Sequence, residues 1–183
     1  MYKKMDNKEK ILKIIFEEPN KEFHIRLLAR LTKMHPNTVI TITDELAKEN
    51  TIFKNSDKER RLTIIKANAQ NEFYKLKKLC YNIEKIRRSG LIDYINKELA
   101  YPTIILFGSY AKAENHKKSD IDLFIITEQK KPINLKRYEE ELSAEIQLFI
   151  YTKNEFIDLK KTNPELTNNV INGFKMEGFL EVL

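Results

Sequence analysis

The residues with the clearest chemical potential lie in the second half of the chain. Gly108-Ser109 is followed, after ten residues, by Asp120-Ile121-Asp122. Side chains alternate between the two faces of a strand, so Asp120 and Asp122 would project from one face, about 6–7 Å apart along the chain. Such a carboxylate pair suits Mg²⁺, which prefers carboxylate and phosphate oxygens. The pattern predicts a site for a metal ion beside a nucleotide.

Gly108 and Ser109 would serve the phosphates of that nucleotide. Glycine has no Cβ and lets the backbone come close, and Ser109 offers an amide and a hydroxyl to anionic oxygens. The alternative is an ordinary Gly-Ser turn, with Ser119-Asp120 ending a loop. A turn does not explain two carboxylates on a strand otherwise made of Ile, Leu and Phe, because their desolvation is costly. We therefore favour a site that is, or once was, catalytic.

The elements around these motifs predict an α+β domain. Apolar runs at 103–107 and 123–127 flank the motifs and are typical of buried strands. The same reasoning gives three helices and one more strand in this half. They are a helix beginning at 91–96, a helix at 135–142, a strand at 145–151 and a helix at 155–161. The expected core is a small mixed sheet of three or four strands flanked by helices.

The second half resembles a known family on three stretches of sequence. They are Phe107-Gly108-Ser109-Tyr110-Ala111-Lys112, the run from Lys118 to Ile125, and a terminal stretch from Ile171 to Gly178. The first two are similar to the motifs of polymerase-beta-like nucleotidyltransferases, particularly the minimal members, and the third is similar to the closing strand of that family. The resemblance covers residues 91–183, about half of the chain.

That resemblance assigns roles to individual residues. Gly108, Ser109 and Lys112 would bind a nucleoside triphosphate, and Asp120 and Asp122 would be catalytic and bind two Mg²⁺ ions. The implied reaction transfers a nucleoside monophosphate to an acceptor hydroxyl and releases pyrophosphate. Positioning and charge neutralisation would supply most of the catalysis.

Two positions depart from the family pattern. Active members usually carry a third carboxylate on a neighbouring strand, and the matching position here is Gln147, whose amide accepts no proton at neutral pH. Glu145 would replace that carboxylate only if the strand register shifts or its side chain reaches back. Ala113 stands where the family commonly has glycine, which predicts a reshaped loop. Whether the domain is an enzyme therefore stays open.

Composition places the chain among folded globular proteins. Of its 183 residues, 42% are hydrophobic and 33% are charged. No apolar run is long enough to span a bilayer, and the first residues lead into a charged helix instead of a signal-peptide core. We expect a cytoplasmic protein without a membrane partner. The single Cys80 excludes an internal disulfide, and the scattered histidines give no zinc spacing.

Charge is divided unevenly along the chain. Residues 1–90 hold 21 Lys and Arg against 12 Asp and Glu, whereas residues 91–183 hold 12 against 15. A basic half favours a polyanionic partner such as nucleic acid. The alternative is that the lysines are simply solvated surface, and charge alone does not decide between the two.

The order of elements in the basic half favours nucleic acid. Apolar spacing predicts helices at 8–16 and 25–31, a third helix starting at 34–37, and then a hairpin with strands at 52–54 and 61–65. This order resembles the winged helix-turn-helix of bacterial and archaeal regulators over residues 8–68. We expect three parts, namely a winged helix-turn-helix DNA-binding domain, a connector helix and a nucleotidyltransferase-like domain. Their bounds are 1–68, 69–90 and 91–183.

In that fold the third helix enters the major groove of double-stranded DNA and the wing contacts the backbone or minor groove. Short polar residues of the helix would reach base edges, and basic residues of the wing would contact phosphates. These candidate DNA-binding residues are Asn37, Thr38, Thr41, Lys58, Arg60 and Arg61. The alternative is a wing that binds protein.

The connector also carries a hydrophobic pattern. Apolar residues recur there at helical intervals, which predicts one apolar face that packs on the winged domain or on a second copy of the chain. They are Phe73, Leu76, Leu79, Cys80, Ile83 and Ile86. A homodimer is therefore one of the expected partners.

Three functions remain compatible with these patterns. The first is a DNA-guided enzyme that transfers a nucleoside monophosphate with Mg²⁺. The second is a transcription regulator whose impaired nucleotidyltransferase domain senses a nucleotide without turnover. The third is an antitoxin-type nucleotidyltransferase that modifies a partner protein. The sequence gives neither the base preference nor the acceptor.

Overall fold

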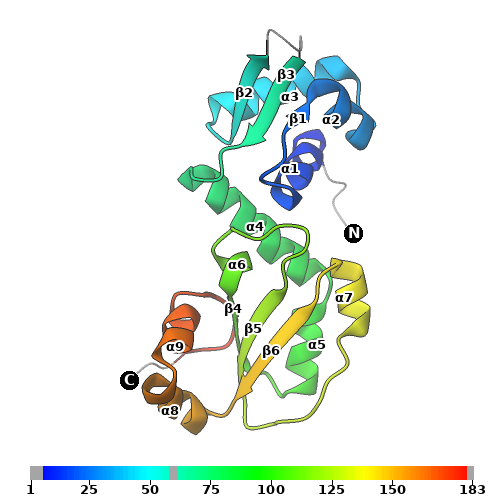
Figure 1. Ribbon diagram of the computed structural model, residues 1–183. Coiled ribbons are helices and arrows are strands. Elements are labelled where there is room, and N and C mark those ends of the chain that lie inside the picture. The colour runs from blue at the N-terminus through cyan, green and yellow to red at the C-terminus, as the bar shows by residue number, and fades with distance from the viewer. Residues whose placement is uncertain (1–5, 58–61, 181–183) are drawn as a thin grey trace. The chain divides into compact units, whose positions relative to one another are not determined.

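The computed structural model describes residues 6–57 and 62–180. The chain divides into two compact units, Met1–Lys78 and Leu79–Leu183, and the division falls inside helix α4 (Glu72–Arg88). Figure 1 gives the course of the chain through each unit. Among the described residues, no helix has both the length and the hydrophobicity needed to cross a bilayer.

The first unit combines three helices with a small antiparallel sheet. The strand order is β1-β3-β2, with β3 paired on both sides. Helices and hairpin lie where the sequence predicts them, whereas the two-residue strand β1 was missed because it is too short to show a period. The elements are α1 (Asn7–Glu17), β1 (Phe23–His24), α2 (Ile25–Thr32), α3 (Pro36–Lys48), β2 (Ile52–Asp57) and β3 (Leu62–Ala67).

Helix α3 shows why its sequence forms a helix at this place. Pro36 occupies the first turn, where a missing N–H costs no hydrogen bond, and the His35 side chain accepts a hydrogen bond from the Asn37 amide. The stripe predicted to face the core does so, since Val39, Ile42 and Leu46 are all buried. The opposite side of α3 therefore faces solvent.

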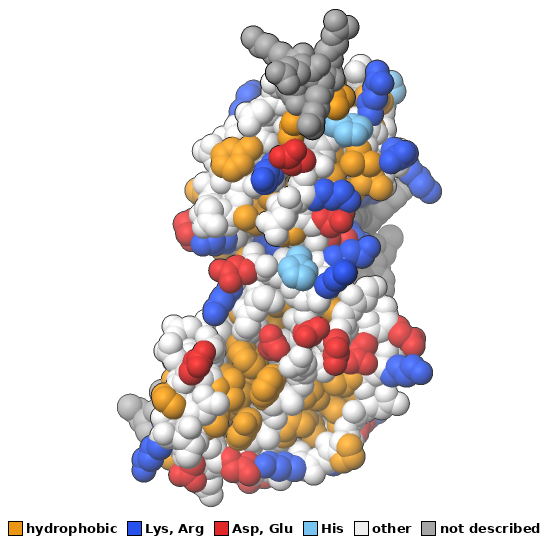
Figure 2. Space-filling model, in the orientation of Figure 1, with side chains coloured by type: hydrophobic (Ala, Val, Ile, Leu, Met, Phe, Trp, Pro, Cys, Tyr) orange, Lys and Arg blue, Asp and Glu red, His pale blue; other side chains and the backbone are white. Residues whose placement is uncertain are grey.

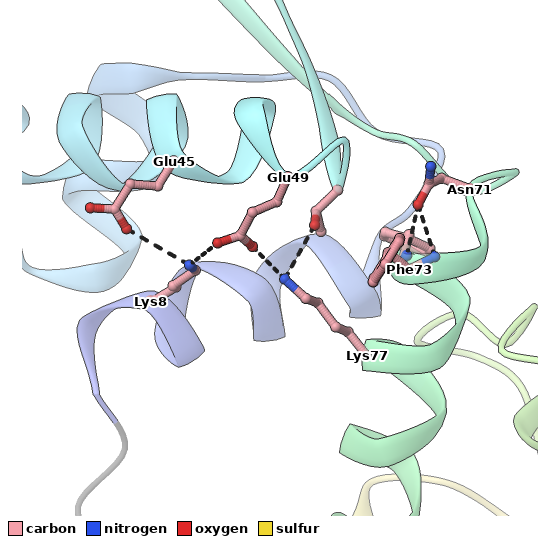
Figure 3. A network of polar contacts seen from close by, with 8 residues as sticks. Lys8, Glu45, Glu49, Asn71, Phe73 and Lys77 are labelled. Carbon is pink, nitrogen blue, oxygen red and sulfur yellow. Dashed lines mark hydrogen bonds and ion pairs between the residues drawn. The ribbon is translucent and has the colours of Figure 1, made fainter.

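Ion pairs and a cap tie the start of α4 into the first unit (Figure 3). Glu49, which follows α3, accepts hydrogen bonds from Lys8 of α1, at 2.6 Å, and from Lys77 of α4. Asn71 caps α4 by accepting from the amides of Phe73 and Tyr74. These cations hold the pKa of Glu49 below its usual value, chiefly through the hydrogen bond from Lys77.

The predicted apolar face of the connector is buried only in part, since Ile86 is fully buried and Ile83 packs against the core of the second unit. The side chains of Phe73 and Leu76 are 66% and 58% exposed, and Cys80 is exposed as well. The fully buried side chains of α4 recur every four residues and include two polar ones, which is why hydrophobicity alone pointed to another face. They are Tyr74, Lys78, Asn82 and Ile86.

The second unit is built on a four-stranded mixed sheet of order β6-β5-β4-β7. Strands β5 and β6 are parallel, and the other pairs are antiparallel. The mixed α+β architecture agrees with the expected nucleotidyltransferase fold. The elements after α4 are α5 (Leu91–Glu98), β4 (Thr103–Phe107), α6 (Gly108–Ala111), β5 (Ile121–Ile126), α7 (Lys136–Leu142), β6 (Ile146–Tyr151), α8 (Lys153–Thr162), α9 (Pro164–Ile171) and β7 (Phe174–Glu177). Helix α9, rich in Thr and Asn, was not predicted.

The sheet of the second unit has two different faces. On one face, aliphatic side chains such as Leu106 and Leu123 pack with α5 and α7. On the other, Phe107 and Phe124 pack with residues of α8 and α9, while Phe149 of β6 is only partly buried. Figure 2 shows hydrophobic side chains gathered over β5 and β6, with acidic side chains along their margin. This second face carries the candidate site at one end.

The last strand, β7, closes the sheet against β4 with a register irregularity between Ile104 and Ile105. The turn from α9 into β7 passes very close to β4 at Gly173. A Cβ there would lie 2.6 Å from the carbonyl oxygen of Leu106 and 2.8 Å from Cγ2 of Ile105. Only glycine therefore allows this approach.

Candidate functional site

The two candidate carboxylates lie at the start of β5. Asp120 directly precedes the strand and Asp122 is its second residue. Asp122 pairs in register with Phe107, the last residue of β4, and alternation places it on the same face as Phe124. Both carboxylates are half-buried. The strand therefore presents two acids at the end of a face that is otherwise aromatic.

The two acids act on one another electrostatically. Burial raises the pKa of Asp122, and the charge of Asp120 raises it further. A raised pKa means that the second negative charge is disfavoured in the folded protein. A cation placed between two such carboxylates would relieve both effects, so the donor set suits a hard divalent ion.

Gly108 lies against this pair. It follows β4 directly, has a φ of +67°, and a Cβ at this position would collide with the Asp122 carboxylate, lying 3.1 Å from its Cγ. The left-handed backbone favours glycine, and any Cβ here would displace the Asp122 carboxylate from its present position. The glycine bend and the acids therefore lie side by side in the fold, although ten residues separate them in the sequence.

Ser109 and Lys112 belong to the short helix α6 and its end. The carbonyl oxygen of Ser109 accepts hydrogen bonds from the amides of Glu114 and Asn115, at 2.9 and 3.2 Å, which folds the segment back on itself. The exposed Lys112 has its Nζ 3.5 Å from Oδ1 of Asn169 on α9. Ser109 is thus fixed by its backbone, whereas Lys112 lies at the surface.

Gln147 lies beside the acids, on the neighbouring strand. It pairs in register with Asp122, and its Nε2 donates a hydrogen bond of 2.9 Å to Oδ2 of Asp120. Glu145 is exposed and precedes β6, where its backbone carbonyl accepts from the amide of Ile121. The side chain that reaches the aspartate pair from β6 is therefore an amide.

Ala113 adopts the backbone conformation that favours glycine. It is buried and has a φ of +57°. The loop after α6 therefore keeps a left-handed residue at this place and carries the strain of an alanine in it.

One comparison with known proteins bears on this unit. Residues 89–176 match the family model described as polymerase beta, nucleotidyltransferase. The match supports a nucleotidyltransferase domain in the second half of the chain, and it includes Gly108, both aspartates and Gln147. It ends before the last residue of β7, and residues 1–88 lie outside it. No curated protein matches this chain.

The two aspartates are the candidate metal ligands of this unit. Among the described residues, no group of three or more His, Cys, Asp and Glu side chains is placed to hold a metal ion. Of the carboxylates that the structure describes, only those of Asp120 and Asp122 meet at this place, because the neighbouring side chain from β6 is the amide of Gln147. The residues present fit a magnesium ion that takes its remaining ligands from nucleotide phosphates and water.

The first unit exposes part of the predicted DNA-binding set on α3. Asn37 and Thr41 are exposed, and the hydroxyl of Thr41 donates to the carbonyl of Asn37, whereas Thr38 is half-buried. A hollow of about 730 Å³ adjoins this helix, and its lining includes Arg26 and Lys54. The predicted wing residues Lys58, Arg60 and Arg61 lie outside the described residues.

Two asparagines of the site were not found from the sequence. Asn82 on α4 donates hydrogen bonds to the carbonyl of Tyr110, at 2.9 Å, and to Oδ1 of Asn115, at 2.8 Å. Both asparagines are buried. The sequence holds no clear signal for them, because a polar residue such as Asn82 in a helix rich in charged residues is equally typical of a solvent-facing position.

Proposed function

We propose that the second unit binds a magnesium–nucleoside triphosphate complex and transfers the nucleoside monophosphate to an acceptor hydroxyl. The observation that carries this proposal is the contact between Gly108 and the Asp122 carboxylate, with Asp120 alongside. The family-model match to residues 89–176 supports the same reaction class. Neither a turn nor a structural ion pair requires two acids at a glycine bend.

Each residue has a distinct task in this proposal. Asp120 and Asp122 would hold the magnesium ion, which when bound would neutralise phosphate charge and favour an in-line displacement. Gly108 lets the backbone approach the phosphates, and the Ser109 amide and hydroxyl donate to them. Lys112 lies at the surface of the same loop and adds positive charge for the triphosphate.

Labelled nucleoside triphosphates test this directly. In the presence of Mg²⁺, the parent protein should transfer label from at least one of these nucleotides to an acceptor. The double variant Asp120→Asn, Asp122→Asn should transfer none. Magnesium-dependent binding without transfer would favour the sensing alternative. The absence of both transfer and magnesium-dependent binding would refute the proposal.

Gln147 supports that sensing alternative. Its amide donates to Asp120 and brings no charge to the metal position. The candidate site therefore has two carboxylates, whereas active members of the family that it resembles usually have three. A domain that binds a nucleotide in this way would report its presence without consuming it. The antitoxin alternative differs only in the acceptor, a hydroxyl on a partner protein.

We further propose that the first unit binds double-stranded DNA through a winged helix-turn-helix. Three helices precede an antiparallel hairpin, the outer side of α3 exposes Asn37 and Thr41, and residues 1–78 hold 18 Lys and Arg against 11 Asp and Glu. A basic surface around a helix with short polar side chains suits phosphates and base edges.

The salt dependence of DNA binding tests the wing. The slope of log K against log salt is negative. Replacing Arg60 and Arg61 with alanine should make it less steep by about 2, because each lost phosphate contact removes about 0.9. The matched control replaces Lys130 and Lys131, which pair with Glu155 and Glu98 in the second unit, and should leave the slope unchanged. Equal slopes in parent and wing variant would exclude a DNA-facing wing.

A further inference from the structure

The segment that would bind the phosphates is held by a residue outside the family's motifs. Asn82 is fully buried on α4, and its amide nitrogen donates to the backbone carbonyl of Tyr110 and to the side-chain oxygen of Asn115. Tyr110 is in α6, directly after Gly108-Ser109, and Asn115 is in the loop that follows. One side chain therefore holds both ends of this segment.

The pairing is reciprocal and enclosed. The Asn115 amide nitrogen lies 3.4 Å from Oδ1 of Asn82, and both residues have less than a tenth of their surface exposed. Buried amides without partners are costly, so the two side chains fix one another strongly. An apolar residue at position 82 would leave the Tyr110 carbonyl without this donor.

The loop itself depends on this anchorage because it is strained. Ala113 has a left-handed backbone with a φ of +57°, which is strained for a residue with a Cβ, whereas Gly108 adopts its φ of +67° without this cost. A strained conformation persists only when its surroundings hold it. Within the segment, Ser109 accepts from the amides of Glu114 and Asn115, so a shift of Asn115 moves the residue that follows Gly108.

We propose that Asn82 is a positioning residue that sets the Gly108–Asn115 segment in its nucleotide-binding shape through Asn115 and Tyr110. This inference rests on the proposed function for its consequence on nucleotide affinity. Its structural part, the anchoring of the segment by α4, stands independently. Asn82 itself contacts neither the acids nor the phosphates in this scheme.

The first test measures amide hydrogen exchange in Asn82→Ala. Exchange at the amides of Glu114 and Asn115 should become at least about tenfold faster than in the parent, because their acceptor Ser109 is no longer held. The matched control is Asn96→Ala, which removes another buried asparagine of the same unit, one whose side-chain oxygen has no hydrogen-bond partner among the described residues. Unchanged exchange in Asn82→Ala would overturn the proposal.

The second test measures the dissociation constant of magnesium–ATP. Asn82→Ala should weaken binding at least about tenfold, whereas Asn96→Ala should shift the melting temperature without changing affinity. If Asn82→Ala fails to fold, Asn115→Ala serves instead, because it retains the bond to Tyr110; a smaller weakening in the same direction is then expected. Equal weakening by Asn96→Ala would overturn a positioning role.

The two tests separate the two proposals. A parent protein that binds no nucleotide refutes the proposed function, yet the exchange measurement still decides whether Asn82 anchors the segment. A parent that binds nucleotide with undiminished affinity in Asn82→Ala refutes the positioning role alone.

Discussion

The two units differ in how their candidate residues are held. In the second unit, Gly108, Asp120, Asp122 and Gln147 converge from strands β5 and β6 and from the turn after β4, and each lies against another member of the group. In the first unit, Asn37 and Thr41 lie on the outside of one helix. Two carboxylates that repel one another at a tight bend are unfavourable unless a ligand compensates them, so their closeness indicates a ligand site. The exposed side of a helix is compatible with many partners. Substitutions in both units test this difference.

The largest effect is expected for Gly108→Ala. An alanine here would have a left-handed backbone and collide with the Asp122 carboxylate. We expect the free energy of unfolding to fall by at least about 2 kcal/mol, and magnesium–nucleotide binding to be lost. Gly90 is the matched control, since it has a φ of +76° and nothing within 4 Å of a Cβ. Gly90→Ala should cost only about 1 kcal/mol and leave binding intact. Thermal unfolding and calorimetry measure both.

A gain is expected for Gln147→Asp. A third carboxylate beside Asp120 should raise magnesium affinity about tenfold or more, because ligand charge governs binding of hard cations. Gln147→Ala removes the hydrogen bond to Asp120 without adding charge, and isothermal titration should show no such gain. If the aspartate variant binds magnesium no better than the alanine variant, Gln147 does not occupy a ligand position.

Asp122→Asn should have a smaller effect on stability than Gly108→Ala, and in the opposite direction. Burial and the charge of Asp120 both disfavour the Asp122 carboxylate, so the neutral amide should stabilise the metal-free protein by about 1 kcal/mol, or about 2–4 °C in melting temperature. Thermal unfolding in a chelator measures this. A loss of stability would show that the carboxylate has a structural partner, which would weaken the case for a ligand site.

The smallest effect is expected in the first unit, at Glu49→Gln. Its pKa is lowered by Lys77 and Lys8, so the ionised form stabilises the fold above the unfolded-state pKa, and this contribution disappears as pH falls through the lowered pKa. Since these ion pairs are partly exposed and screened, about 0.5 kcal/mol is expected at pH 7 and a smaller difference at pH 3. Chemical unfolding at both pH values checks it, and a constant difference would contradict an electrostatic origin.

Much of the fold could be predicted from local pattern. Helices α1 to α3, the hairpin and strands β4 to β6 follow from apolar spacing and turn residues. Strand β1 is too short to show a period, and α9 is rich in residues that favour turns. The buried face of α4 could not be predicted, because Lys78 and Asn82 are buried there. Lys78 lies over the ring of Tyr74 and Asn82 donates to Asn115, and local hydrophobicity predicts neither contact.

Some features of the candidate site could also be predicted from local pattern, and others could not. Alternation along a strand predicts that Asp120 and Asp122 face one side, and the strand-to-strand register then places Gln147 beside them. The closeness of Gly108 to Asp122 depends on how β4 and β5 pair, and the role of Asn82 depends on a helix far away in sequence. Such long-range contacts leave no local signature.

The absence of a side chain at Gly173 also lets β7 cover the edge of β4. Any larger residue would strike the Leu106 carbonyl and push β7 away from β4. The uncovered edge of β4 would then present free main-chain groups between aliphatic and aromatic side chains, a surface that recruits strands from other molecules. One hydrogen atom in place of a methyl group thus separates a closed sheet from one prone to aggregate.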